Sequence, residues 1–288
     1  MKDKFFGTGV PLLTPFNDDM SVDYNAIAKF VDYYLANGIN YFILHGTTSE
    51  APTTTFEEKM KILDIVVEKN KSRVPIVVGF GGYNTMEIIA NIKKCNFENI
   101  DAVLSVTPYY NKPNQKGLLE HYRAIADTSP VPVILYNVPT RTNVNLTAET
   151  TLQLAEHPNI IGIKEASGNL LQIMSIIKNS PKDFFVVSGD DLLTYPMISL
   201  GAIGVISVVA LAKPNEFSKM VKLALEGNWN EAQKIHYQLF DFINAIFEDG
   251  NPAGVKAAMY IQNHIKYNLR LPLVRVQQST LEKIKNLL

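Results

Sequence analysis

Short runs of apolar and β-branched residues recur along the chain, and each is followed by a longer segment with the spacing of an amphipathic helix. The runs are almost continuously apolar, which predicts strands buried on both faces, as in a parallel sheet covered by helices. Eight such runs occur, at residues 9–13, 41–44, 75–78, 102–106, 133–136, 160–163, 184–187 and 204–208.

The segments between these runs complete a regular alternation of strand and helix. Helices are expected at residues 23–36, 56–69, 86–95, 117–126, 148–156, 170–177, 192–200 and 214–225. Eight such units in about 225 residues predict an α/β fold, a (β/α)8 TIM barrel. A doubly wound open sheet is the alternative, but the first strand is followed by Thr14-Pro15-Phe16-Asn17-Asp18 and not by a glycine-rich dinucleotide motif.

The last part of the chain has a different pattern, because residues 227–288 show helical periodicity and turn signals without a strand run. We therefore expect a (β/α)8 catalytic barrel over residues 1–226 and a C-terminal helical region over residues 227–288. The predicted fold is thus a TIM barrel with a helical C-terminal extension packed on it.

The charge balance and the cysteine content limit which binding partners and which cellular location are expected for this protein. The 288 residues carry 27 basic and 28 acidic side chains without a block of like charges, so neither nucleic acid nor an anionic membrane surface is an expected partner. Cys95 is the only cysteine, which excludes an intrachain disulfide and favours a reducing, cytoplasmic location. The first residues include no long apolar run, so no signal peptide or membrane anchor is expected.

Polar residues gather where the predicted strands end, which is where TIM barrels place their active sites. Hydroxyls, glycines and one lysine are therefore expected at a single mouth, from Thr14, Ser207 and residues 45–50, 79–82, 107–110, 136–139, 164–167 and 188–191. The five histidines never occur at i, i+3 or i+4 spacing, so no metal site is predicted.

Lys164 ends the apolar run 160–163. Desolvation favours the uncharged form of a lysine amine, which is the nucleophilic form. The run alone also fits a lysine that begins a solvated loop or pairs with Glu165. Tyr136 ends the neighbouring strand, where a phenol could shuttle protons to the amine or simply fill the barrel mouth.

Two further strand ends fit the binding of small carboxylates. Gly46-Thr47-Thr48 offers hydroxyls and free backbone N–H groups at a loop opening, although threonine is also an ordinary strand and cap residue. Arg141 could clamp a second carboxylate with two hydrogen bonds, or could be a solvated surface residue.

These motifs together resemble the dihydrodipicolinate synthase family over essentially the whole chain. The resemblance is carried by Gly-Thr-Thr-Ser-Glu at 46–50, Thr-Pro-Tyr-Tyr at 107–110, Tyr-Asn-Val-Pro-Thr-Arg-Thr at 136–142, Gly-Ile-Lys-Glu-Ala at 162–166 and Ser-Gly-Asp-Asp at 188–191. It implies that Lys164 forms a Schiff base with pyruvate. It also implies that Tyr136 donates and accepts protons, relayed through Thr47 and through Tyr110 of a neighbouring subunit.

The same resemblance implies the binding residues and the assembly. Thr48 would hold the pyruvate carboxylate, the backbone around Gly189 and Ile206 would line the pocket, and Arg141 would receive the carboxylate of aspartate semialdehyde. A homotetramer built from tight dimers is implied, with no cofactor, because the lysine imine itself is the electron sink. The chain departs from the family at Ser49, where glycine is usual, and at 253–254, where the C-terminal turn usually contains a proline.

Two other functions fit parts of the pattern. A sister lyase acting on N-acetylneuraminate or on a 2-keto-3-deoxy sugar acid would keep the lysine and tyrosine, but such relatives lack an arginine at the position of Arg141 and often carry serine at that of Thr48. A non-catalytic barrel that binds a keto acid would be expected to lose Lys164 or Tyr136, and both are present.

Feedback by L-lysine is a property of many members of this family. Inhibited members bind L-lysine in a cleft between subunits and have a histidine where this chain has Phe56. This chain also brings the cation Lys59 towards that cleft. Glu87 and Tyr109 remain. Because a like charge opposes a cationic ligand and a polar contact is lost, we expect weak or absent lysine inhibition.

Overall fold

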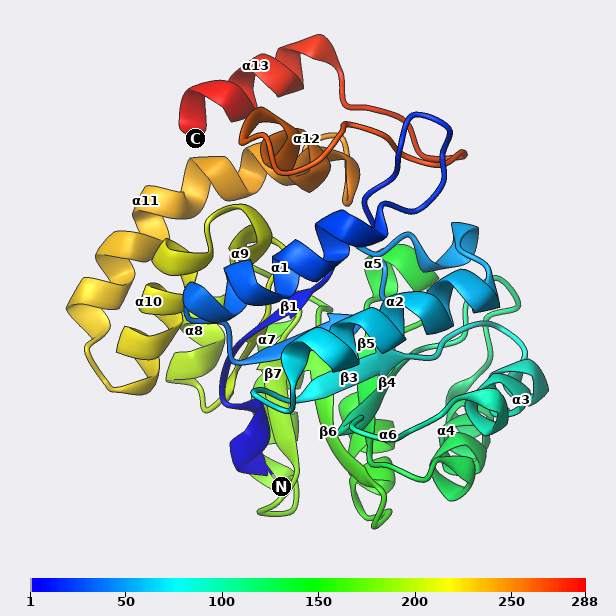
Figure 1. The fold of residues 1–288 in the computed structure, drawn as a ribbon. Helices are drawn as coiled ribbons and strands as arrows, with labels where there is room; N and C mark the ends of the chain where they lie inside the picture. Colours follow the sequence, from blue (N-terminus) through cyan, green and yellow to red (C-terminus); the bar gives the residue numbers. More distant parts are fainter. Residues whose placement is uncertain (1) are drawn as a thin grey trace.

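The computed structural model describes residues 2–288, and eight parallel strands close into a barrel at its centre (Figure 1). Neighbours in sequence are neighbours in the barrel, and β1 pairs with β8 to close it. The strands are β1 (Gly7–Pro11), β2 (Tyr41–Leu44), β3 (Ile76–Gly79), β4 (Ala102–Val106), β5 (Val133–Asn137), β6 (Ile160–Glu165), β7 (Phe185–Ser188) and β8 (Gly204–Ile206). The predicted TIM barrel is confirmed.

Helices surround the barrel in the predicted alternation. They are α1 (Tyr24–Ala36), α2 (Phe56–Asn70), α3 (Thr85–Lys94), α4 (Gln115–Thr128), α6 (Ala148–Ala155), α7 (Leu170–Asn179), α8 (Thr194–Ser199) and α10 (Pro214–Leu225). Four short helical segments were not predicted: the 3-10 turns η1 (Lys2–Phe5) and η2 (Ala51–Thr53), and α5 (Pro139–Thr142) and α9 (Val209–Ala212). Each is too short to show a helical period in the sequence.

Only β2 and β4 keep their predicted bounds, and the other six strands begin or end one or two residues away from them. The first ends at Pro11 and not at residue 13, although the Leu12 N–H still donates to the Ile43 carbonyl of β2 at 2.8 Å. The last ends at Ile206, since the chain turns into α9 instead of extending to residue 208. Several barrel helices begin at polar caps, and Thr55 and Glu58 form a reciprocal capping box at the start of α2.

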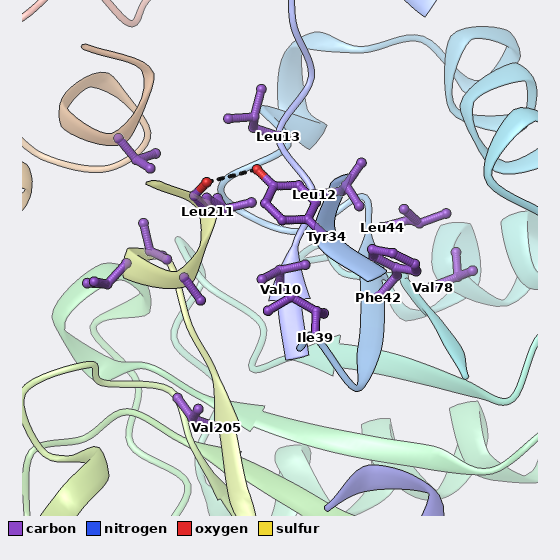
Figure 2. Close-up of a cluster of buried hydrophobic side chains, with 14 of the residues drawn as sticks. Val10, Leu12, Leu13, Tyr34, Ile39, Phe42, Leu44, Val78, Val205 and Leu211 are labelled. Atoms are coloured by element: carbon purple, nitrogen blue, oxygen red, sulfur yellow. Dashed lines mark hydrogen bonds between the residues drawn. The ribbon is translucent and has the colours of Figure 1, made fainter. Parts of the chain in front are cut away.

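Apolar side chains fill two separate regions. A large cluster lies between the strands and the helices, where the buried Tyr34 of α1 donates its hydroxyl to the Leu211 carbonyl of α9 over 3.1 Å (Figure 2). A smaller cluster fills the inside of the barrel. There Phe5 packs against Tyr41 and Phe185 at the amino ends of β2 and β7, which leaves the carboxyl ends for the polar residues.

The C-terminal residues form α11 (Trp229–Phe247), α12 (Ala253–Ile261) and α13 (Gln278–Leu287). In Figure 1 α12 and α13 lie at the opposite end of the molecule from the N-terminus. Ile243 of α11 and Ile284 of α13 belong to the same apolar cluster as the barrel helices, so this region packs on the barrel as expected. The division into parts 1–226 and 227–288 stays a prediction. No helix within residues 2–288 is long and apolar enough to cross a membrane.

Candidate active site

A cavity of about 300 Å³ opens at the carboxyl ends of the strands. Strand ends and the loops after them supply its base, and α11 supplies one wall through Ile243, Asn244 and Phe247. Six of the eight site residues predicted from the sequence line it: Thr47, Thr48, Tyr136, Arg141, Lys164 and Gly189.

Lys164 lies on β6 directly beside Tyr136 of β5, its partner in the parallel ladder. Its exposure is 6%, and its Nζ lies 4.2 Å from the centre of the Tyr136 ring. No hydrogen bond or ion pair to this amine is made by the residues that the structure describes. Gly189 packs closely against it, since a Cβ there would come within 2.8 Å of Lys164 Cε. The expected buried lysine is therefore present, and it is unpaired within residues 2–288.

Glu165, the next residue, does not pair with Lys164. It is buried, and its carboxylate accepts hydrogen bonds from the side chains of Asn137 and Gln172, each at 3.2 Å, and from the backbone N–H of Ser167 at 2.7 Å. Burial raises the pKa of the Glu165 carboxyl, and these hydrogen bonds oppose the shift. Adjacent strand residues point to opposite faces, which separates the two side chains.

The loop of Thr47 and Thr48 is tied to its surroundings by several hydrogen bonds. Thr48 is buried, and its Oγ1 accepts a hydrogen bond from Asn251 Nδ2 at 3.0 Å. Ser49 Oγ donates to the Leu12 carbonyl at 2.5 Å, and Thr14 Oγ1 donates to the Ser49 carbonyl at 2.7 Å. The hydroxyl at position 49 thus adds a link to the end of β1 that a glycine could not make.

Glu50 anchors the end of the same loop in a buried ion pair. It adopts a positive φ of 53°, and its carboxylate pairs with Lys256 of α12; both side chains have 0% exposure. Its other oxygen accepts the backbone N–H of Arg270 at 3.0 Å, and Lys256 also donates to the Asn268 carbonyl at 3.0 Å. Burial lowers the pKa of Lys256 to about 8, and the charge of Glu50 opposes the shift.

Arg141 lies at the rim of the cavity, and the two remaining predicted residues, Ile206 and Tyr110, lie outside it. Arg141, on α5, lies at the rim of the cavity, with Nη2 at 3.5 Å from the Asn251 carbonyl. Ile206 is buried inside the barrel and does not line the cavity. Tyr110 is 86% exposed on the loop after β4, near Tyr83, and does not line the cavity either. Its predicted relay role requires a neighbouring subunit and stays a prediction.

Two cavity residues were missed by the sequence analysis. Asp191 is buried, and its carboxylate accepts hydrogen bonds from Ser207 Oγ and from the Val208 N–H at 3.2 Å. Burial raises the pKa of Asp191 to about 7. Asp191 belongs to the polar segment 188–191 but had no assigned role, and Asn251 lies in none of the polar segments. Only the folded chain reveals their partners. No group of three or more metal-ligating side chains is found among residues 2–288.

Comparison with known proteins gives consistent matches over the full length. The model of the dihydrodipicolinate synthetase family matches residues 4–288. A 4-hydroxy-tetrahydrodipicolinate synthase from Parabacteroides distasonis is 52% identical over 98% of this chain and 95% of its own length. The enzyme of the same name from Phocaeicola vulgatus is 50% identical over the same shares.

Solved structures agree with this result. Dihydrodipicolinate synthase from Aquifex aeolicus superposes with a TM-score of 0.95 at 38% identity, covering 98% of this chain and 96% of its own. The enzyme from Cyanidioschyzon merolae, solved with lysine bound, has a TM-score of 0.94 at 37% identity, covering 98% and 97%. The likeness therefore extends to the barrel and to the C-terminal helices.

Proposed function

Because the chain belongs to the dihydrodipicolinate synthetase family, we propose that Lys164 carries its reaction as a Schiff-base nucleophile. The activity is that of a lyase that condenses pyruvate with aspartate 4-semialdehyde to give 4-hydroxy-tetrahydrodipicolinate, on the route to diaminopimelate and lysine. Family membership favours this activity over the sugar-acid lyase and over the non-catalytic barrel. The observation that supports Lys164 most directly is a buried amine, unpaired within residues 2–288, at the base of the cavity.

The lysine amine attacks the ketone carbon of pyruvate, a C–N bond forms, and the ketone oxygen leaves as water. Loss of a methyl proton from this imine gives an enamine, whose carbon bonds to the aldehyde carbon of the second substrate while the aldehyde oxygen takes up a proton. The amino group of the second substrate then attacks the imine carbon, which closes the ring and releases Lys164. The imine is the electron sink, so the proposal needs no cofactor.

Proton transfer in these steps is assigned to Tyr136. Its ring lies beside the Lys164 amine, which places its side chain next to the site where water and the imine form. A phenol in this position can donate a proton to the leaving oxygen and take one back. We propose that Thr47, and Tyr110 of a neighbouring subunit, relay protons to it.

Substrate carboxylates are assigned to two separate groups. Thr48 and the loop backbone bind the carboxylate of pyruvate, with the backbone near Gly189 completing the pocket. Arg141 at the rim binds the carboxylate of aspartate semialdehyde, because a guanidinium offers two parallel N–H donors to a carboxylate. The order from base to rim matches the order in which the substrates would enter.

The relay through Tyr110 connects the mechanism to assembly. Tyr110 is 86% exposed beside Tyr83, so its phenol is available to a second copy of the chain. We propose a homotetramer built from tight dimers in which this tyrosine completes the neighbour's site. The cytoplasmic location expected from the sequence stays a prediction.

Reduction with borohydride in the presence of pyruvate tests the proposed chemistry. We expect a permanent mass increase equal to one reduced pyruvyl group, on the peptide that contains Lys164. A coupled assay should show consumption of pyruvate with aspartate semialdehyde. Turnover of N-acetylneuraminate without turnover of the semialdehyde would contradict the assignment of the substrates.

A further inference from the structure

Asn251 connects the C-terminal region to the loop assigned to pyruvate. The residue follows α11, its exposure is 8%, and it lines the cavity. Its Nδ2 donates a hydrogen bond to Thr48 Oγ1 at 3.0 Å across 203 residues of sequence. Five residues later Lys256 pairs with Glu50, two residues beyond Thr48. The segment 251–256 thus contacts the loop 46–50 at two points.

The direction of the Asn251–Thr48 hydrogen bond determines what the threonine can do. A threonine hydroxyl has one proton to donate and two lone pairs. When Asn251 donates to the oxygen, the Thr48 proton remains free for another acceptor. A pyruvate carboxylate offers only acceptors, so it needs that proton.

We propose that Asn251 is a positioning residue that orients the Thr48 hydroxyl so that it donates to the carboxylate of pyruvate. This inference rests on the proposed function of Lys164 and Thr48. It also assigns a specific role to residue 251: a side chain that accepts a hydrogen bond from Thr48 would take the proton away from the substrate. Asn251 Oδ1 is buried without a hydrogen-bond donor within residues 2–288, so the amide interacts with Thr48 through its nitrogen alone.

Two substitutions at position 251 distinguish orientation of the Thr48 hydroxyl from simple contact with it. Asn251→Asp replaces the donor with an acceptor, and Thr48 must then donate to residue 251. We expect the KM for pyruvate to rise about 10- to 100-fold, which is the loss of one charge-assisted hydrogen bond. Asn251→Ala leaves the Thr48 proton free but unguided, and a rise of less than about 10-fold is expected. The KM for the semialdehyde should change far less in both variants.

A double-mutant cycle with Thr48→Val separates hydroxyl orientation from the charge that the aspartate introduces. Without the hydroxyl, Asn251→Asp should add less than about threefold to the pyruvate KM if its effect passes through Thr48. An Asn251→Asp penalty that is the same in both backgrounds would overturn the proposal, and so would an unchanged pyruvate KM in Asn251→Asp itself. Thermal unfolding of each variant shows whether it is folded.

Borohydride trapping keeps this test distinct from the test of the reaction. At saturating pyruvate, Asn251→Asp should still be trapped on Lys164, because the amine is untouched. Absence of trapping in the unmodified chain would contradict the proposed function. Full trapping in all variants with an unaltered pyruvate KM would contradict only the role of Asn251.

Discussion

Two lysines of this chain are almost completely buried, yet their surroundings are opposite. Lys164 lines the cavity, and its amine lies 4.2 Å from the centre of the Tyr136 ring and makes no hydrogen bond or ion pair within residues 2–288. Lys256 lies beside the ring of Phe16 at 4.3 Å, but it also pairs with the Glu50 carboxylate and donates to the Asn268 carbonyl. Burial and a neighbouring aromatic ring are therefore common to both.

The difference indicates which feature would make a buried lysine reactive. Lys256 donates to the Glu50 carboxylate and to the Asn268 carbonyl and does not line the cavity at the strand ends, so it stabilises the chain and is not available to a substrate. Lys164 makes no hydrogen bond or ion pair within residues 2–288 and lines the cavity, so its amine is accessible to a substrate. Access and the absence of a partner distinguish the two, whereas burial does not.

The largest effect is expected from Lys164→Ala, which removes the amine that forms the imine. Borohydride trapping should be lost entirely, whereas the unmodified chain should be labelled at Lys164 and not at Lys256. Because no hydrogen bond within residues 2–288 is broken, the melting temperature should change little. Peptide mass spectrometry measures the first effect and thermal unfolding the second. Labelling of Lys256 would contradict the conclusion that a paired buried lysine is not available to a substrate.

Tyr136→Phe tests the aromatic neighbour of the reactive lysine. It keeps the ring but removes the phenol, so turnover should fall about 10²- to 10⁴-fold while slow trapping persists. Steady-state rates with saturating substrates measure this effect. A matched control is Tyr34→Phe, since the Tyr34 hydroxyl is buried on the Leu211 carbonyl at 3.1 Å, outside the cavity, and its loss should leave the turnover unchanged. Equal rates in both variants would remove Tyr136 from proton transfer.

Lys256→Met tests the paired lysine, and its effect should be on stability. The change leaves Glu50 buried without its cation, which costs about 3–5 kcal/mol of unfolding free energy. The double variant Glu50→Gln with Lys256→Met removes both charges and should recover most of this loss, because the amide oxygen of the new glutamine can still accept the Arg270 N–H. Urea unfolding measures both. A double variant as unstable as the single one would show that the ion pair itself stabilises the fold.

Lys59 is an intermediate case between the two buried lysines. Burial lowers its pKa, and the charges of Glu87 and Glu58 oppose this shift. It lines a small cavity of about 50 Å³ with His45 and Phe56. We propose that this cation weakens binding of L-lysine, a ligand that the Cyanidioschyzon merolae relative carries in its structure.

Inhibition by L-lysine is therefore the smallest expected effect. Half-inhibition should need roughly millimolar concentrations or more, which corresponds to only about −4 kcal/mol of binding. The double variant Phe56→His with Lys59→His should be inhibited at lower concentrations. Initial rates measured against rising L-lysine settle the point, and half-inhibition of the unmodified chain well below millimolar would contradict it.

The barrel and its central residues could be predicted because they follow local rules. Strand runs and helix spacing are periodic, and the ends of buried parallel strands make Lys164 and Tyr136 candidates, whereas their roles are implied only by the family resemblance. The contact of Asn251 with Thr48 joins residues 203 positions apart and has no period or motif spacing. The bond from Ser207 to Asp191 likewise depends on how β7 and β8 are placed side by side. The contribution of α11 to the cavity wall could not be predicted from the sequence for the same reason.

The Glu50–Lys256 pair has a consequence for synthesis of the chain on the ribosome. Glu50 is translated long before its partner, since 206 positions separate them. Every barrel strand has been made before Lys256 is added to the chain. Until then, the Glu50 carboxylate at the end of the loop 46–50 has no cation to pair with. We expect the loop 46–50 to take its final shape only after α12 leaves the exit tunnel. Translation order would then delay the proposed imine chemistry until almost the whole polypeptide has been completed.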